Sequence, residues 1–168
     1  MSKTETLERN PSAAALTPGP EYGRLNVFVG RWKMEGLQRD SPIGPAAEID
    51  AVETYEWLPG GFFLIHRING TLGDRELACI EVTGYDASRR LYTLHTFYVD
   101  GTSNQWQARE RDGTWTYTGT WQTTGERMQV RCTQVFNDAR NASSSKWEYS
   151  TDGSQWRVFW DVRAVKIE

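Results

Sequence analysis

The sequence predicts an all-β protein: one closed, antiparallel, up-and-down barrel of about ten strands with a short helical turn before the first strand. Three observations carry this prediction. From Gly30 onward, apolar and polar residues alternate with the period of two that is typical of β-strands. Turn-forming pairs such as Asp100-Gly101 interrupt the alternation about once per strand length, which favours hairpins. No interval is long enough for a crossover helix, and this excludes a parallel α/β sheet.

The residues before the first strand divide into a tail and a helical segment. Residues 1–20 are polar and rich in Ser, Thr, Ala and Pro, so we expect a flexible tail, followed by a single barrel domain over residues 21–168. Within residues 21–29 apolar side chains recur at helical spacing, which predicts one or two helical turns with one buried side. The chain shows no secretion signal and no apolar run of the roughly 20 residues that a membrane-spanning helix needs. We therefore expect a soluble, cytoplasmic protein that does not bind membranes.

Ten runs between turn signals are the predicted strands. They span residues 30–39, 46–57, 61–69, 75–85, 89–99, 103–112, 114–122, 126–137, 140–150 and 154–166. The reversals between them include Pro59-Gly60-Gly61, Asn69-Gly70, Asp112-Gly113 and Asp152-Gly153. An open sheet of this length would leave two long unpaired edges, which closure into a barrel removes.

The clearest alternation lies in residues 114–121, where Trp115, Tyr117 and Trp121 occupy one face and threonines the other. Successive side chains of a strand point to opposite faces, so one face here is buried and the other is wet. The same pattern occurs at Met128, Val130 and Cys132, and at Trp156, Val158, Trp160 and Val162. The inward face of the barrel is therefore expected to be rich in aromatic side chains.

Composition and charge reduce the number of function classes that the sequence allows. Eight Trp, seven Tyr and six Phe require either a wide interior or a binding surface. A net charge of −3 with mixed signs argues against nucleic-acid binding, which needs a basic stripe. Cys79 and Cys132 have neither the spacing of a metal site nor the number of a disulfide scaffold, so we expect two reduced, buried thiols.

Several motifs resemble one bacterial family of lipocalin-like (calycin) barrels, DUF1579. They are Gly30-Arg31-Trp32, Glu56-Trp57-Leu58-Pro59-Gly60-Gly61-Phe62-Phe63, Gly84-Tyr85-Asp86-Ala87-Ser88 and Tyr98-Val99-Asp100-Gly101, with the Trp-rich last strands. The resemblance covers the chain from about Arg24 to Ile167 and implies a closed barrel with an internal pocket. It brings no established substrate. In calycins the Gly-x-Trp tryptophan lies at the closed end against a basic residue of the last strand, which implies a cation–π pair between Trp32 and Arg163.

The haem-binding barrels of nitrobindin type also have an early Gly-x-Trp. There the motif continues with closely spaced glycines, whereas this chain continues Lys33-Met34-Glu35-Gly36. This departure weakens a haem hypothesis, and no cofactor and no metal are expected.

Few residues suggest catalysis. His66 and His95 each alternate with apolar residues, so both could point into the barrel as ligand-orienting groups, as a haem or metal pair, or as an acid–base pair. They could also be hydrogen-bonded core residues or outward-facing residues. Glu53 shares a face with Tyr55 and Trp57 and could be a buried acid, although a cross-strand ion pair is the commoner role for such a carboxylate. The serines at 143–145 are more typical of an exposed face than of a nucleophile. We assign no catalytic residue.

The aromatic side chains are the best candidates for function, as the wall of a cavity for a small apolar or aromatic ligand. Arg131 could join the histidines in orienting such a ligand. The predicted ligand-binding residues are Tyr55, Trp57, Leu64, His66, His95, Phe97, Trp106, Trp115, Tyr117, Trp121, Met128, Trp147 and Trp160. Alternatives are an isomerase, cyclase or hydrolase working in the same cavity, a haem protein, and a filled barrel that uses exposed Trp residues to form a homodimer.

Overall fold

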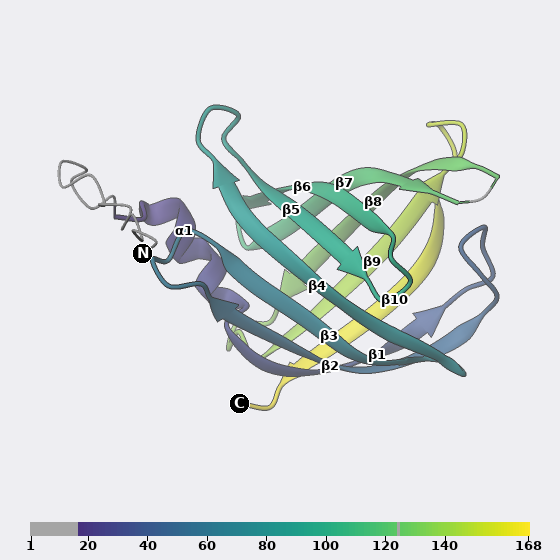
Figure 1. The fold of residues 1–168 in the computed structure, drawn as a ribbon, viewed down its shortest axis with the longest axis horizontal. Coiled ribbons are helices and arrows are strands. Elements are labelled where there is room, and N and C mark those ends of the chain that lie inside the picture. The colour runs from purple at the N-terminus through teal and green to yellow at the C-terminus, as the bar shows by residue number, and fades with distance from the viewer. Residues whose placement is uncertain (1–16, 124) are drawn as a thin grey trace, which may run out of the picture.

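A computed structural model describes residues 17–123 and 125–168. Most of the predicted tail, residues 1–16, lies outside the described residues. The chain forms a closed barrel of ten antiparallel strands, in the order β1-β10-β9-β8-β7-β6-β5-β4-β3-β2, which confirms the predicted fold class (Figure 1). Every strand pairs with its neighbours in sequence, and β1 pairs with β10 to close the barrel.

The strands agree closely with the predicted runs. Before them, α1 (Pro20–Arg24) and the 3₁₀ turn η1 (Leu25–Val27) form the predicted helical segment. The strands are β1 (Gly30–Gln38), β2 (Ala47–Trp57), β3 (Leu64–Leu72), β4 (Arg75–Asp86), β5 (Leu91–Tyr98), β6 (Ser103–Arg111), β7 (Thr114–Gln122), β8 (Arg127–Phe136), β9 (Ala142–Ser150) and β10 (Arg157–Lys166). Within the described ranges, neither helical element is long and apolar enough to span a membrane.

The helical segment lies across one end of the barrel (Figure 1). Leu25 and Phe28 are buried in the core, and the indole Nε1 of Trp32 donates a hydrogen bond to the Phe28 carbonyl at 2.6 Å. The phenol of Tyr92 donates to the Glu21 carbonyl at 2.8 Å. These bonds hold the segment against strands from both sides of the barrel, so it serves as an end cap.

The predicted partner of Trp32 is wrong. Trp32 is buried as expected, but the cation over its ring is Lys166, with Nζ 5.5 Å from the ring centroid. Arg163 is exposed, because its neighbour Ala164 occupies the inward position on β10.

The turn predicted at Asn69-Gly70 is also wrong, because β3 continues through both residues and the chain reverses at Gly73, where φ is +59°. Gly70 pairs with Ala51 on β2 and with Leu77 on β4. A Cβ at Gly70 would lie 2.2 Å from the Asp50 carbonyl oxygen. This glycine therefore permits a close approach of two backbones and does not make a turn.

The last strand contains an irregularity that the alternating pattern did not reveal. The register between β9 and β10 shifts between Val158 and Trp160, and Phe159 takes the buried position. Trp156, expected on the inner face with Trp160, lies outside the barrel with its ring 4.1 Å from the Arg131 guanidinium carbon. A β-bulge reverses the facing of every residue on one side of it, which explains the error.

We predict that Gly70→Ala destabilises the barrel by about 2 kcal/mol, because the added methyl group forces the backbones of β2 and β3 apart. Chemical denaturation monitored by circular dichroism measures this change. Gly23→Ala in α1 is the matched control, since its Cβ meets nothing within 4 Å. It should leave stability unchanged or raise it by up to about 1 kcal/mol. Equal stability of the two variants would contradict the close-approach role of Gly70.

Candidate functional site

The barrel interior contains a cavity of about 120 Å³ whose wall is mainly aromatic and aliphatic. Among the predicted ligand-binding residues, those that line it are Tyr55, Leu64, His66, Trp106, Trp115, Tyr117, Trp121, Trp147 and Trp160. Their rings meet mostly edge to face, as between Trp106 and Trp147, whose centroids lie 5.6 Å apart. This edge-to-face geometry is favourable for aromatic pairs.

Four predicted residues lie elsewhere. Trp57 packs against the core near the cap, where its Nε1 donates to Asn26, and Met128 is buried in the core beside the cavity. His95 and Phe97 point outward, because Tyr92, Leu94 and Thr96 take the buried positions of β5.

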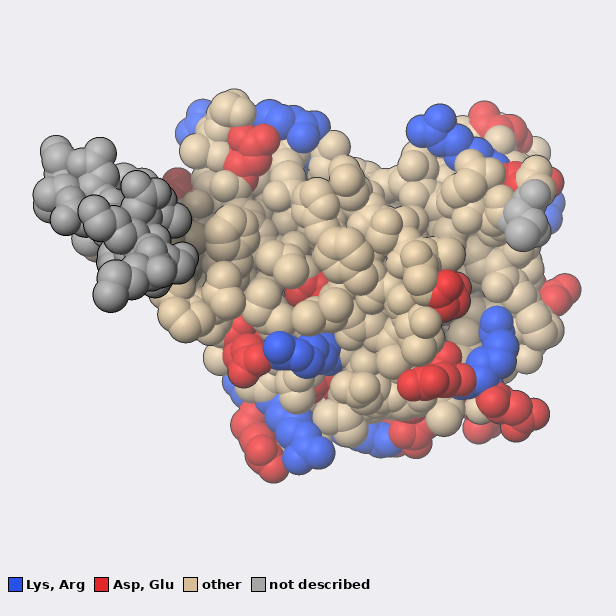
Figure 2. All heavy atoms as spheres, in the orientation of Figure 1, with Lys and Arg blue, Asp and Glu red and all other residues tan. Residues whose placement is uncertain are grey.

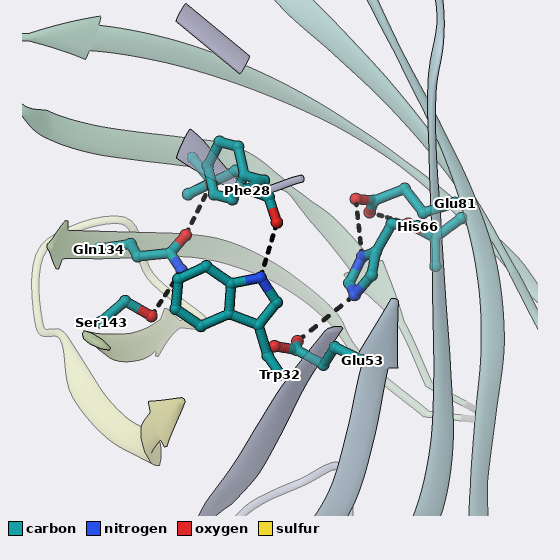
Figure 3. A network of polar contacts seen from close by, with 9 residues as sticks. Phe28, Trp32, Glu53, His66, Glu81, Gln134 and Ser143 are labelled. Carbon is teal, nitrogen blue, oxygen red and sulfur yellow. Dashed lines mark hydrogen bonds and ion pairs between the residues drawn. The ribbon is translucent and has the colours of Figure 1, made fainter. Parts of the chain in front are cut away.

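The polar part of the cavity is a cluster of three ionisable side chains: Glu53 on β2, His66 on β3 and Glu81 on β4 (Figure 3). His66 Nδ1 lies 3.5 Å from Glu81 Oε1, and His66 Nε2 lies 3.4 Å from Glu53 Oε1. The imidazole is buried and stacks on the Tyr55 ring with centroids 3.9 Å apart and planes 7° apart. The ring is thus fixed between two carboxylates.

Strand register explains how these residues meet. Tyr55 is opposite His66, His66 is opposite Glu81, and Glu81 is opposite Thr96 on the next strand. Side chains directly opposite each other on one face of an antiparallel sheet lie within contact distance. The Thr96 hydroxyl donates to Glu81 Oε2 at 2.6 Å, which holds this carboxylate in place.

The two carboxylates determine the charge of His66. Burial alone lowers the pKa of His66, but its contacts with Glu53 and Glu81 and their negative charges outweigh this effect and raise it from 6.5 to about 9. At neutral pH the ring is therefore an imidazolium with two N–H donors. Its Nε2, although buried, makes no good hydrogen bond to the protein, since the contact with Glu53 is too long for a strong one.

The cavity wall also contains a polar network without charged side chains. Tyr117 donates to Gln134 Oε1 at 2.8 Å, and Gln134 Nε2 donates to Ser143 Oγ at 3.3 Å. Ser143 is buried and Ser145 lines the cavity, so the predicted exposed face is wrong for these two serines, whereas Ser144 is exposed as predicted.

Both cysteines are free thiols, as expected. Cys132 is buried, whereas Cys79 is partly buried and lines the cavity. Burial raises the pKa of Cys79 to about 12, so its thiol stays protonated and unreactive at neutral pH.

A second hollow lies on the outer face of β5 to β8, between the β4–β5 turn and the β9–β10 turn (Figure 2). Both His95 and Arg131 line this hollow and not the cavity. Arg131 forms an ion pair with Glu148 at 2.7 Å. The prediction that Arg131 orients an internal ligand is therefore wrong.

The cavity does not fit a haem. His66 is its only histidine, and this ring is protonated between two carboxylates and cannot act as an axial ligand. A cavity of about 120 Å³ has room for a guest of roughly one ring and not for a porphyrin. Within residues 17–123 and 125–168, no group of three or more His, Cys, Asp or Glu side chains is arranged to hold a metal ion.

The fold and the aromatic-lined cavity inside it define the class of protein: a closed ten-strand antiparallel barrel with an internal pocket. The chain belongs to the family described as "Protein of unknown function (DUF1579)", whose model matches residues 17–156. Comparison with curated proteins gives no match. The barrel is similar to the crystal structure of Rv2717c from M. tuberculosis, with a TM-score of 0.61 at 10% identity over 89% of this chain and 99% of that chain. At this identity the likeness shows the fold alone.

We predict that His66 makes stability depend on pH. The pKa of His66 is raised in the folded protein, so its contribution to stability is complete below pH 6.5 and is lost as pH rises through about 9. The full contribution is on the order of 3 kcal/mol. Denaturant unfolding of wild type and His66→Gln between pH 6 and pH 10 measures it as a difference that shrinks over this window.

A pH-independent difference between the two proteins would contradict this account. Because His66→Gln could also perturb packing, NMR titration of the wild-type imidazole provides a second measurement. His95→Gln identifies the signal of the other histidine. A His66 signal that titrates at or below pH 6.5 would show that the carboxylates do not hold the proton.

Proposed function

We propose that the barrel binds a small, flat, largely apolar molecule in its cavity, with one polar group of the ligand placed at the Glu53–His66 end. The observation that carries this proposal is the buried Nε2 of His66, which faces an aromatic-lined cavity without a good hydrogen-bond partner. Leaving buried polar groups weakly bonded costs about 1–3 kcal/mol, and a ligand that donates a hydrogen bond to Glu53 or accepts one from His66 recovers part of this cost.

The size of the cavity supports a ligand of about one ring. An engineered apolar cavity of roughly 150 Å³ in another protein binds benzene, and the cavity here is about 120 Å³. The wall contains indole rings packed edge to face, and a flat aromatic guest can make further contacts of the same kind with them.

The polar end supports an orienting role for the cluster. Glu53 and His66 provide an acceptor and a donor 3.4 Å apart at one place in an otherwise mainly apolar wall. Pockets that bind small molecules usually combine such a wall with a few fixed polar groups.

We predict that Ala108→Leu abolishes binding by filling the cavity. Ala108 is buried and lines the cavity from β6, and the added carbons would occupy much of its volume. Quenching of tryptophan fluorescence by toluene, phenol and benzyl alcohol measures affinity, which should fall at least tenfold. Native mass spectrometry of the purified wild-type protein would detect a ligand retained from the cell.

Arg109→Leu is the matched control, because Arg109 is the next residue on β6 and is exposed. It should bind the three probes like wild type. Thermal unfolding confirms that both variants are folded. Binding that survives Ala108→Leu in a folded protein would contradict the cavity as the binding site.

A second candidate function is acid catalysis on a bound substrate, and the charge state of His66 favours it. With a pKa of about 9, His66 is a proton donor at neutral pH, while Glu53 beside it is positioned to accept a proton. An isomerase, cyclase or hydrolase would be supported if the wild-type protein converts a bound compound and the His66→Gln variant still binds this compound but does not convert it. A ligand recovered unchanged would support binding alone.

A further inference from the structure

The ionisable side chains that line the cavity are unbalanced in sign. Apart from tyrosines and the protonated Cys79, the ionisable residues that the structure describes in the lining are Glu53, Glu81 and His66, and this described lining contains neither lysine nor arginine. Outside the cavity, strand carboxylates such as Glu56 and Asp50 form ion pairs with Arg67 and Lys33. Among the described residues, the cavity lining therefore has two carboxylates and at most one positive charge.

This imbalance matters because Glu53 and His66 are both buried. The raised pKa of His66 keeps its ring protonated at neutral pH, and the cluster then has a net charge of −1. A buried charge without a counterion is costly in a medium of low dielectric constant, and the cost is offset when an opposite charge is bound beside it. A cation of roughly one ring in size would neutralise the cluster.

Of the two carboxylates, Glu53 is the one available to a ligand. Glu81 is held on one oxygen by Thr96 at 2.6 Å and faces His66 Nδ1 with the other. Glu53 has its contact with His66 Nε2 at 3.4 Å, which leaves it able to accept a strong hydrogen bond from a bound N–H group. Figure 3 shows Glu53 and Glu81 on opposite sides of the imidazole.

The aromatic wall adds a second attraction for a cation. The faces of Trp and Tyr rings attract ammonium groups through the ring quadrupole, more strongly where water is excluded. Tyr55 is stacked on His66 and unavailable on that face, but Trp106, Trp147 and Tyr117 also line the cavity.

We infer that the ligand of this cavity is a small organic cation, a protonated amine attached to a flat apolar body, with its ammonium group on Glu53 and its body among the indole rings. This inference rests on the proposed function and names the charge of the ligand. A carboxylate ligand of the same size would meet a net negative cluster, and the described part of the lining offers no lysine or arginine to pair with it, so the site favours cations over anions.

Three probes of matched shape test the inference: benzylamine, benzyl alcohol and benzoate, titrated into the wild-type protein at pH 7 with tryptophan fluorescence and calorimetry. We expect benzylamine, protonated at this pH, to bind at least tenfold more tightly than benzyl alcohol, and benzoate not to bind. Equal or tighter binding of benzyl alcohol, or any binding of benzoate comparable to that of benzylamine, would overturn the inference while leaving the proposed function intact.

The carboxylate is tested with Glu53→Gln. Affinity for benzylamine should fall at least tenfold, while affinity for benzyl alcohol should change less than threefold. Glu56→Gln is the matched control on the same strand, because Glu56 is exposed on the opposite face, and it should leave both affinities unchanged. Equal benzylamine binding by Glu53→Gln and wild type would overturn the role of Glu53.

The wild-type comparison of the three probes decides the charge preference even if Glu53→Gln does not fold. If none of the three probes binds to the folded wild-type protein, both the inference and the proposed function fail. If all three bind without preference and Ala108→Leu abolishes their binding, only the inference fails.

Discussion

The width of a ten-strand barrel is the constraint on which the rest of this structure depends. Strand number fixes the diameter, so the interior must be filled from the side chains that point inward. Here large aromatic rings fill most of that space, and small residues occur where the rings need room. Gly119 is one example, because a Cβ at this position would lie 2.4 Å from the Trp106 ring. The cavity is the volume that these rings leave between them.

Within that volume, three side chains from adjacent strands form the polar cluster. Each of them would be costly alone, since a buried charge without a partner destabilises a folded protein. Together they are mutually compensated except for one negative charge and one weakly bonded donor. Clusters with strongly perturbed ionisation inside a cavity are typical of functional sites, and structural ion-pair networks rarely leave a donor of this kind unsatisfied.

The sequence was sufficient for the fold because its signals are local. Alternation and turn residues determine a strand and its neighbours, and strands that pair in order require no long-range information. It was harder to predict which side chains of each strand point into the barrel. On β5, Leu94 and Phe97 are both apolar but face opposite sides, so periodicity could not decide the orientation of His95. On β10 the irregularity between Val158 and Trp160 reversed the facing of Trp156.

The cluster itself could be predicted only in part. Glu53 and His66 were recognised as candidate polar residues of the interior, but Glu81 and Thr96 were missed. Their signal is the position of one turn: a reversal at Gly73 places His66 opposite Glu81, whereas a reversal at Asn69-Gly70 pairs His66 with a residue nearer the start of β4. Gly70 resembles a turn glycine in sequence, although its role is to let two backbones approach. Prediction of the His66–Glu81 ion pair therefore required the steric role of Gly70, which the pattern of a single strand does not reveal.

The pairing of β10 with both β1 and β9 has a consequence for the order of events during synthesis. The last strand to be made is the one that joins the first strand to the rest of the sheet. Until it leaves the ribosome, β1 and β9 both present unpaired edges, which are sites at which chains can associate wrongly. Closure must also bring together residues from opposite ends of the chain, which slows folding. The completed barrel is thus available only after β10 has left the ribosome.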